Sequence, residues 1–457
     1  MNLYTPMEFI GRDRELSTLE RAYSGNASLI LLTGRRRIGK TRLLKEFIKD
    51  KDALYFLATN SVESDMMQDL WDIIRSKDGT YGKPSGWNDL FSQIPNGNRR
   101  VLVIDEFSYM AKMSDGFLIR FQGIYDEILK DSGVLTILCG SHMSVMNGLS
   151  EDRNSPLYGR FDRRIILWPL RFDNIPSTGN TMDDIERYAI HGGIPRYMEL
   201  LGNGLLRDDV SYNIMDPSSM MFSDPLVLLN TDAGTSNVYL SLLKAIAHGN
   251  HRSSEISSAL EMPSGKLSPY ISKLIEIGMI RKDIPIFENN EDTSKKGRYV
   301  ISDNFIRFWF RFVHPYRSQL MRNDDSFALS RFDADFVQRH VSFVFEGICR
   351  EFITVNHNII GFIPERIGRF WNKSVEVDVI AVDTSSKKAF VGECKYRKNR
   401  AIDSHILAEL RSKVTSVKEL EDYDITYGLF SISGFEEGFN ESDVKLIDLY
   451  NNIKSRH

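Results

Sequence analysis

The sequence predicts an α/β protein whose N-terminal part is a doubly wound parallel sheet, followed by further domains. Apolar runs recur along its first part, at "SLILLTG", "ALYFLAT", "VLVIDE", "VLTILCGS" and "RRIILWPL". Runs of this kind are typical of parallel strands buried on both faces. Helical patterns lie between them, which is the alternation of a doubly wound sheet. At 457 residues the chain is too long for one core, and length alone indicates about three domains.

The periodicity changes along the chain and predicts the domain order. Residues 1–170 carry the parallel sheet, and 171–232 turn helical, which we interpret as a helical lid. Residues 233–301 show helix, helix, helix and a polar hairpin, the order of a winged helix. An aromatic stretch, 302–329, is predicted as a bridging helical segment, and 330–457 again alternates strands with helices as a second α/β domain.

Composition places the chain among soluble globular proteins, with 42% hydrophobic and 26% charged residues. No apolar run approaches the ~20 residues of a membrane span, and the N-terminus lacks the pattern of a secretory signal, so we expect a cytoplasmic protein without a membrane partner. Cys139, Cys349 and Cys394 lack metal-type spacing, and we predict no disulfide or zinc site. The net charge of −4 neither supports nor excludes DNA as a partner.

The stretch "GRRRIGKT" matches GxxxxGK[ST] in full, directly after a predicted strand and before a predicted helix. In this context the backbone N–H groups of the loop surround a β-phosphate, Lys40 reaches the β and γ oxygens, and Thr41 offers its hydroxyl to Mg²⁺. A basic turn without a ligand is the alternative. The residues of the predicted phosphate loop are Gly34, Arg35, Arg36, Arg37, Ile38, Gly39, Lys40 and Thr41.

"VLVIDE" supplies a second half of this predicted site. Asp105 stands at a strand end, where its carboxylate would hold Mg²⁺ through water, and Glu106 would polarise the attacking water. An apolar strand ending in Asp-Glu is common by itself. Together with the phosphate loop it predicts binding and hydrolysis of a nucleoside triphosphate.

Residues 1–232 resemble the extended AAA+ and STAND-type P-loop ATPases of archaea and bacteria, through "FIGRDREL", "TGRRRIGKT", "VLVIDEF", "ILCGSH", "SPLYGRF" and "GGIPRY". The resemblance implies ATP and Mg²⁺ as cofactors. It implies that the backbone at Gly11 and Arg12 reads the adenine and that Ser141 is the first sensor. It also implies that "GGIP", with Gly193 and Pro195, closes over the nucleotide.

Three of these assignments have plain alternatives. "GRDREL" also fits a helix start capped by Asp13, and Ser141 fits a polar group that satisfies a buried strand end. Arg160, at the "LYGR" position, is by resemblance an arginine finger for the γ-phosphate of a neighbouring subunit, and a solvated arginine is the alternative. A finger that acts in trans would make the active form a homo-oligomer.

In the predicted winged helix, the recognition helix is expected to open at Ser268 and Pro269. Lys266, Tyr270 and Lys273 give it a modest basic face suited to DNA. Acidic residues on the helix and the hairpin disfavour tight phosphate contact. DNA binding and a role as an adaptor between the domains therefore both stay open.

Near the C-terminus, "AFVGECKYRKNR" follows the strand pattern "VEVDVIAVD" across a short turn. Alternate residues of a strand share a face, so Glu393 and Lys395 point together, and Asp378 on the neighbouring strand can face the same pocket. Two carboxylates and the backbone carbonyl of Cys394 can hold one or two Mg²⁺ ions that activate water, while Lys395 stabilises the transition state.

This arrangement resembles the PD-(D/E)xK restriction-endonuclease-like fold over residues 330–457, and also the C-terminal domain that follows the winged helix in many archaeal ATPases. By resemblance Glu346 stands at the helical acidic position. The proline expected before the aspartate is replaced by Val377, and Glu376 is either an added ligand or a rim charge. An inert fold, in which Glu393 and Lys395 form an internal ion pair, is the alternative.

The sequence thus predicts an ATPase whose nucleotide state controls a Mg²⁺-dependent nuclease-like domain acting on DNA. The second interpretation is a STAND-like, ATP-gated regulatory switch whose nuclease-like domain has no activity.

Overall fold

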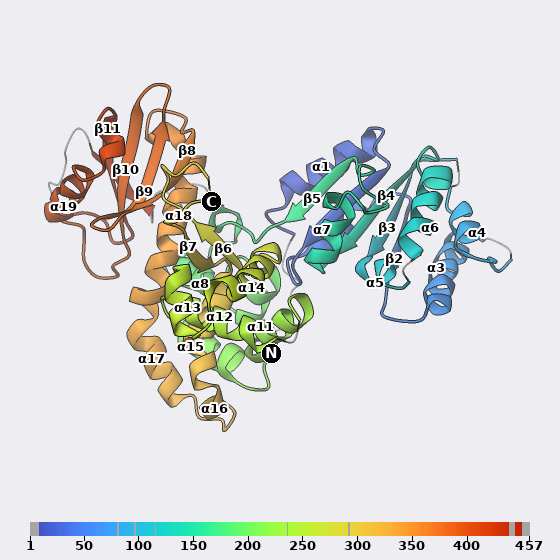
Figure 1. Ribbon diagram of the computed structural model, residues 1–457, viewed down its shortest axis with the longest axis horizontal. Helices are drawn as coiled ribbons and strands as arrows, with labels where there is room; N and C mark the ends of the chain where they lie inside the picture. The colour runs from blue at the N-terminus through green and yellow to red at the C-terminus, as the bar shows by residue number, and fades with distance from the viewer. Residues whose placement is uncertain are drawn as a thin grey trace. The chain divides into compact units, whose positions relative to one another are not determined.

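The computed structural model describes residues 9–79, 82–95, 97–114, 116–234, 236–290, 293–437 and 444–449. The chain forms two compact units (Figure 1). Unit 1 consists of Met1–Leu170 with Ile194–Glu199, and unit 2 of Arg171–Gly193 with Leu200–His457. The first unit therefore ends where the predicted sheet domain ends, but it also takes in six residues of the predicted lid. The finer division of 171–457 into four segments stays a prediction.

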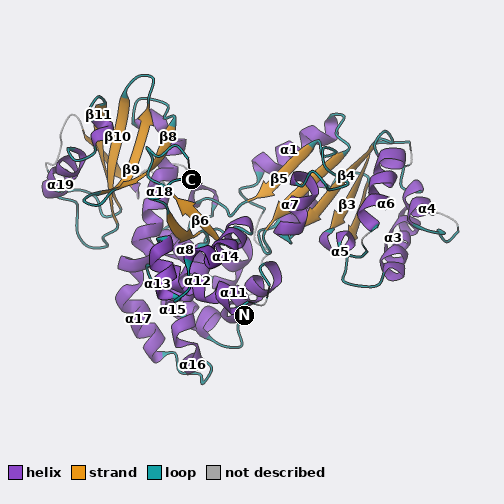
Figure 2. Cartoon of the chain, viewed as in Figure 1, coloured by secondary structure: helices purple, strands orange, loops and turns teal. Residues whose placement is uncertain are grey.

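Unit 1 is built on a five-stranded sheet of order β2-β3-β4-β1-β5, in which every pairing is parallel (Figure 2). The predicted α/β class with a parallel sheet is confirmed. Strand β1 lies between β4 and β5, so the chain leaves β1 to build one side of the sheet and returns to the other. Ligands of such sheets bind beyond the carboxyl ends of the strands at this point of reversal. The strands are β1 Leu29–Gly34, β2 Ala53–Leu57, β3 Arg100–Asp105, β4 Val134–Gly140 and β5 Arg163–Leu167.

Helices follow each of the first four strands and flank the sheet (Figure 2). Strands β1, β3 and β4 are buried at every position, as the unbroken apolar runs predict. The helices are α1 Asp13–Ser24, α2 Lys40–Phe47, α3 Glu63–Asp78, α4 Trp87–Ser92, α5 Ser108–Ala111, α6 Phe117–Ile124, α7 Met143–Glu151 and, starting in this unit, α9 Pro195–Leu201.

The first part of unit 2 is helical. Its segment 237–301 shows three helices followed by a two-stranded antiparallel hairpin, the predicted order of elements, and the winged-helix assignment itself stays a prediction. The expected helix start at Ser268 is wrong: α14 begins at Ser264 and Pro269 lies inside it, five residues after its start. The elements are α8 Thr181–His191, α10 Leu206–Val210, α11 Met220–Asp232, α12 Asn237–Ala247, α13 Ser253–Ala259, α14 Ser264–Glu276, β6 Ile280–Asp283, β7 Arg298–Ile301, α15 Asn304–Phe312, α16 Arg317–Leu320 and α17 Ser326–Phe336.

The second part of unit 2 is a mixed sheet of order β12-β11-β10-β9-β8. Strands β8, β9 and β10 pair antiparallel, whereas β10, β11 and β12 pair parallel. Apolar side chains of β9, β10 and α19 form its core. The elements are α18 Ser342–Val355, β8 Arg366–Trp371, β9 Glu376–Asp383, β10 Lys388–Lys395, α19 Ser404–Val414, β11 Asp424–Ser431 and β12 Val444–Asp448.

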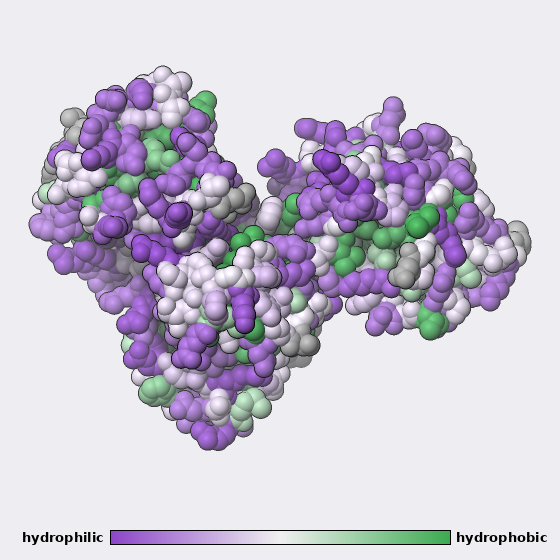
Figure 3. All heavy atoms as spheres, viewed as in Figure 1, coloured by the Kyte–Doolittle hydropathy of each residue, from purple (hydrophilic) through white to green (hydrophobic). Residues whose placement is uncertain are grey.

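The face of the molecule in Figure 3 is mostly hydrophilic on both units, and each unit also shows smaller hydrophobic areas. Within the described ranges, no helix combines the length and the apolar composition that a membrane crossing requires.

Candidate functional site

The predicted phosphate loop joins β1 to α2 in unit 1. Its first glycine is required by close approach, because a Cβ at Gly34 would lie 2.9 Å from the carbonyl oxygen of Leu167. Gly39 and Arg37 have positive φ angles of 97° and 70°, so the loop turns sharply before the helix starts. Backbone N–H groups at the start of α2 are therefore presented to an anion.

Lys40 is buried and its ammonium group lies inside the loop. Nζ donates to the carbonyl oxygens of Gly34 at 2.8 Å and Arg35 at 3.1 Å, and to Oγ of Ser141 at 2.8 Å. The lysine thus joins the loop to the end of β4. A phosphate in the loop would receive the same ammonium group with little rearrangement.

Asp105 ends β3 beside the loop. Its Oδ2 accepts hydrogen bonds from Thr41 Oγ1 at 2.8 Å and from the hydroxyl of Tyr55 at 2.6 Å. Burial would raise the pKa of Asp105, but hydrogen bonds from Cys139, Tyr55 and Thr41 outweigh it and lower the pKa. The carboxylate stays ionised beside a hydroxyl, and this oxygen pair fits a Mg²⁺ ion that also binds a triphosphate.

Glu106 follows with a φ of 53°, an uncommon angle for a residue other than glycine. Its carboxylate accepts from Ser141 Oγ at 2.5 Å and from the Ser141 N–H at 3.2 Å. Ser141 therefore contacts both Lys40 and the candidate base. The positions predicted for the base and the first sensor are brought together.

Arg12 lies within reach of the same loop, through its side chain. The guanidinium donates to the carbonyl oxygen of Ile38 at 3.1 Å and to that of Trp168 at 2.8 Å, and it pairs with Glu15 at 3.2 Å. It ties the loop to the chain beyond β5. Adenine recognition by the backbone at Gly11 and Arg12 stays a prediction.

Pro195 also stands near the loop, because its Cγ would lie 3.8 Å from a Cβ at Gly39. The ring of Tyr197 lies under the guanidinium of Arg37, 5.9 Å from its centroid. Gly193 belongs to unit 2, and its N–H donates to Nδ1 of His191 at 3.0 Å. Closure of this segment over a nucleotide stays a prediction.

Arg160 is held within its own unit. Its guanidinium makes hydrogen bonds of 2.8 to 3.1 Å to both carboxylate oxygens of Asp126 and donates to the carbonyl oxygen of Pro156 at 2.8 Å. The pair lowers the pKa of Asp126 through the hydrogen bond from Arg160. A role as a finger in trans, which stays a prediction, requires this pair to open.

A second polar site lies in unit 2, where β9 and β10 separate. The ladder between them runs from Lys388↔Asp383 to Gly392↔Val379 and goes no further. Beyond it, Oδ2 of Asp378 accepts the N–H of Cys394 at 3.0 Å. The carboxylate of Asp378 thus takes the place of a backbone carbonyl as the acceptor. Asp378, Glu393 and Lys395 lie where the two strands no longer pair.

Glu393 is buried, and two lysines contact its carboxylate. Lys395 Nζ lies 2.7 Å from Oε1, and Lys413 Nζ, from α19, lies 2.9 Å from both oxygens. The predicted shared face of Glu393 and Lys395 is confirmed by this contact. The internal ion pair of the alternative interpretation is also present.

The electrostatics of Asp378 differ from those of Asp105. Burial first, and then the charges of Glu346 and Glu393, raise the pKa of Asp378 to about 7. Burial also raises the pKa of Glu346, whose carboxylate lies 3.4 Å from Nη2 of Arg369. Glu376 pairs with Arg369 at 2.6 Å, which favours a structural charge over a metal ligand.

Asp378, Glu393 and Glu346 are the carboxylates of this second site that could hold a metal ion. Within the described part of the chain, no three His, Cys, Asp or Glu side chains are placed so that together they hold a metal ion. Glu346 therefore does not complete a three-carboxylate site with Asp378 and Glu393. Asp378, Glu393 and the Cys394 carbonyl remain the predicted donor set, and cation binding by them stays a prediction.

Comparison with known proteins assigns the N-terminal part. Residues 9–201 match the family described as "ATPase domain predominantly from Archaea". An uncharacterized protein of Methanocaldococcus jannaschii is 31% identical over 96% of this chain and 99% of its own length. The chain belongs to this archaeal ATPase family. ATP binding and hydrolysis are thus assigned to the N-terminal part, which carries the phosphate loop.

A second family, described as archaeal and bacterial proteins of unknown function, matches residues 309–406 of this archaeal ATPase and so includes Asp378, Glu393 and Lys395.

Among solved structures, the Walker-type ATPase paby2304 of Pyrococcus abyssi is similar at 20% identity and a TM-score of 0.49, covering 67% of this chain and 97% of that one. A STAND protein with a tetratricopeptide repeat sensor from Pyrococcus horikoshii is similar at 14% identity and a TM-score of 0.28, covering 78% and 53%.

Sequence reasoning missed two contacts of these sites. Tyr55 binds Asp105 from the neighbouring strand β2, and nothing in the apolar run "ALYFL" indicates that. Lys413 had a usable signal: it lies three residues after Leu410 and one before Val414, on the buried stripe of α19. A lysine on a buried helical face needs a carboxylate partner.

Proposed function

We propose that ATP hydrolysis in unit 1 controls a metal-dependent nuclease site in unit 2 that cleaves DNA. The observation that carries the proposal is the buried carboxylate of Glu393 near the half-buried Asp378, with Lys395 on the same strand face as Glu393. Burial first, and then the neighbouring carboxylates of Glu346 and Glu393, raise the pKa of Asp378 to about 7, and such perturbed groups are typical of a site built for chemistry or for a cation.

In the ATPase step, Lys40 binds the β- and γ-phosphate oxygens, and Thr41 and Asp105 would hold the Mg²⁺. Bound Mg²⁺ neutralises charge on the phosphates. Glu106 takes the proton of the attacking water once its carboxylate leaves Ser141. Ser141 thereby links the phosphate-binding lysine to the base, since it contacts both.

In the nuclease step, Asp378, Glu393 and the Cys394 carbonyl would hold Mg²⁺, which supplies an activated water when bound. Lys395 orients this water and stabilises charge on the phosphodiester. Lys413 holds Glu393 in place from α19. Of the basic residues that follow Lys395, Lys398 pairs with Glu186 at 2.6 Å and Arg400 with Asp403 at 3.0 Å, so they support DNA contact less than the sequence suggests.

The test is DNA cleavage by the full chain. Supercoiled and single-stranded DNA are incubated with Mg²⁺ or Mn²⁺, with and without ATP, and products are resolved on gels. Lys395→Ala is expected to remove cleavage and keep ATP hydrolysis. The matched control is Lys388→Ala, an exposed lysine on the same strand, which should cleave like the parent. Lys40→Ala should lose ATP hydrolysis, and any ATP dependence of cleavage with it.

A STAND-like switch with an inert nuclease-like domain is the second candidate. It is favoured by one observation, the two lysines that already neutralise Glu393. A calorimetric titration with Mn²⁺ distinguishes the nuclease from the switch. Binding that disappears in Asp378→Asn supports the nuclease, whereas absence of both Mn²⁺ binding and cleavage, with ATP hydrolysis intact, supports the switch.

Light scattering with and without ATP tests the proposed homo-oligomer.

A further inference from the structure

A pocket of about 230 Å³ lies inside unit 2, away from the carboxylates described above. The hairpin strand β7, helices α15 and α18, and strands β8 and β9 each contribute to it, next to the end of α12. Hydrogen bonds join parts of this pocket that are distant in the chain, such as Arg298 Nη1 on β7 to Glu376 Oε1 on β9, 78 residues away, at 3.0 Å. The polar lining consists of His251, Arg298, Arg307, Arg369 and Glu376.

The charges in this pocket do not balance. Arg298 and Arg369 share one carboxylate oxygen of Glu376, at 3.0 and 2.6 Å. Arg307 forms no ion pair with any described residue. Burial lowers the pKa of His251, so its imidazole stays neutral. Three guanidinium charges therefore face one carboxylate in the pocket, and the carboxylate of Glu346, 3.4 Å from Arg369, is the nearest further anion.

Arg307 is the residue that most needs a partner. Its guanidinium stacks on the ring of Phe343, 3.5 Å from the centroid, which fixes its plane and leaves its edge for hydrogen bonds. Nη1 is buried and has no hydrogen-bond partner, and the same holds for Nε of Arg369. Burial first, and then the positive charges of Arg311 and Arg369, lower the pKa of Arg307 to about 9, while the carboxylate of Glu346 opposes the shift.

We propose that this pocket binds the phosphate group of a small phosphorylated ligand. A phosphate monoester carries two negative charges and accepts several hydrogen bonds from arginines in one plane. It thereby supplies negative charge to three arginines that Glu376 and Glu346 neutralise only in part, and it accepts more hydrogen bonds than a carboxylate ligand would. Ile246, Val300 and Phe343 form an apolar wall for the organic part of the ligand.

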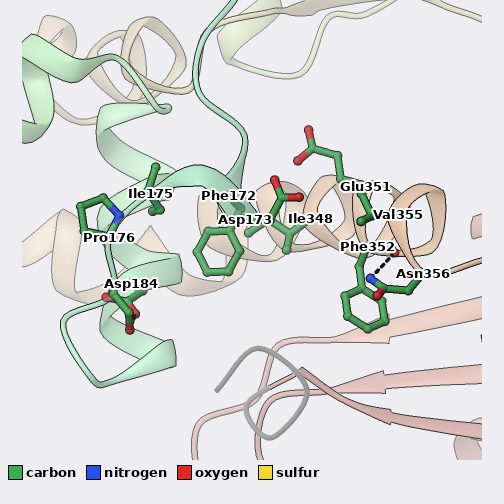
Figure 4. Close-up of a pocket in the computed structure, with 11 residues that line it drawn as sticks. Phe172, Asp173, Ile175, Pro176, Asp184, Ile348, Glu351, Phe352, Val355 and Asn356 are labelled. Carbon is green, nitrogen blue, oxygen red and sulfur yellow. Dashed lines mark hydrogen bonds between the residues drawn. The ribbon is translucent and has the colours of Figure 1, made fainter. Parts of the chain in front are cut away.

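A second pocket of unit 2, of about 150 Å³, provides an internal contrast (Figure 4). Its walls are apolar, with Phe172 and Phe352, and its charged lining residues Asp173, Asp184 and Glu351 are all acidic. Asp184 accepts from Ser177 and Thr178 at 2.6 and 2.8 Å. Such a pocket repels phosphate, so phosphate binding to unit 2 should depend on the arginines alone.

The inference is independent of the nuclease proposal, but the phosphate loop of unit 1 also binds phosphate. The experiment therefore uses the full chain with Lys40→Ala. Inorganic phosphate and AMP are titrated in by calorimetry, and binding to one site is expected. Arg307→Gln should weaken this binding by on the order of tenfold to a hundredfold, because a charge-assisted hydrogen bond is lost in a buried place.

Two further variants keep the result interpretable. Arg331→Ala removes an exposed arginine that pairs with Asp335 elsewhere in unit 2 and should bind phosphate like the parent. Arg307→Lys keeps the charge and should retain part of the affinity, and thermal melting reports whether each variant folds. Tighter binding of AMP than of inorganic phosphate would identify an organic phosphate as the ligand, and equal binding would identify free phosphate. Absence of binding in the Lys40→Ala chain, or equal affinity in a folded Arg307→Gln variant, overturns the proposal.

Discussion

Asp105 and Asp378 each lie in a site that contains a lysine, Asp105 buried and Asp378 half-buried, and their surroundings are opposite. Asp105 is surrounded by neutral donors, the hydroxyls of Thr41 and Tyr55, and its pKa is lowered. Asp378 has one backbone donor and two carboxylate neighbours, and its pKa is raised to about 7. The carboxylate of Asp105 is thus ionised at neutral pH, whereas the proposed cation at the C-terminal site would have to displace a proton from Asp378.

The lysines differ in the same way. Lys40 contacts carbonyl and hydroxyl oxygens, which are weak partners that a phosphate can displace. Lys395 and Lys413 contact a carboxylate directly. A cation at Glu393 must therefore compete with two ammonium groups. The comparison indicates that Lys40 can bind a phosphate with little rearrangement, whereas a cation can bind Glu393 only by displacing Lys395 and Lys413.

The largest effect is expected from Glu106→Gln, which tests whether the first site is poised for hydrolysis. A glutamine keeps the shape and the contact with Ser141 but cannot take a proton, so ATP turnover should fall by roughly 10²- to 10⁴-fold. ATP affinity should change by no more than a few-fold. Phosphate release and fluorescent-nucleotide binding measure the two. Unchanged turnover would remove Glu106 from the base role.

Asp378→Asn tests the opposite electrostatics of the second site. Between the ordinary carboxyl pKa of 3.8 and about 7, the folded chain holds a proton that the unfolded chain has released, so this group lowers stability as pH rises through that window. Asparagine does not titrate, so the variant does not lose this stability. The free energy of unfolding of the variant minus that of the parent should therefore rise by roughly 1 to 3 kcal/mol from pH 5 to pH 8.

Urea unfolding at pH 5 and pH 8 provides the measurement. Asp383→Asn is the matched control, because Asp383 lies on the same strand, is also half-buried and has its pKa lowered to about 2 by hydrogen bonds from Ser385 and Ser386. Its effect should be the same at both pH values. A pH-independent effect of Asp378→Asn as well would show that Asp378 is an ordinary carboxylate.

Arg12→Ala tests how the phosphate loop is held. The substitution removes the hydrogen bonds to the carbonyl oxygens of Ile38 and Trp168, of which the Ile38 bond is buried, and should cost roughly 1 to 3 kcal/mol of stability. ATP affinity should fall as well. Arg14→Ala removes an exposed arginine of α1 and should change neither stability nor ATP affinity. If the two variants unfold at the same urea concentration, Arg12 does not hold the loop.

Tyr55→Phe is expected to have the smallest effect and sharpens the comparison. It removes one of the neutral donors to Asp105, which should cost about 1 kcal/mol and leave ATP turnover within a few-fold of the parent, because Thr41 and Mg²⁺ still contact the carboxylate. Chemical denaturation and turnover are both measured. A loss of turnover comparable to that of Glu106→Gln would instead assign Tyr55 a direct part in catalysis.

The sequence predicted sites whose residues are adjacent in the chain better than sites assembled from distant segments. "GRRRIGKT" and "VLVIDE" each lie on one strand and the turn after it, so local geometry suffices to place Lys40, Thr41 and Asp105. Glu393 and Lys395 were predicted for the same reason, since they share one strand. Glu346 was expected beside them by resemblance, and its actual partner Arg369 comes from a strand that the motif does not include.

Other features depended on contacts over long separations. Arg12 was expected to act through its backbone, but its side chain reaches a carbonyl 156 residues away. The balance of charge around Arg307 likewise requires knowing that α15, α18 and β8 meet. Buried polar groups must find partners wherever packing places them, and spacing along the chain does not encode which partner that is.

The sequence by itself thus determined the parallel α/β sheet, the phosphate loop with Asp105 beside it, and the shared strand face of Glu393 and Lys395. These follow from strand and helix periods and from motifs a few residues long. Only the tertiary structure decided that Asp105 is held by neutral donors, that Asp378 lies among like charges, and that three arginines meet in one pocket. Burial and the identity of distant neighbours set a group's charge state, and both arise when the chain folds.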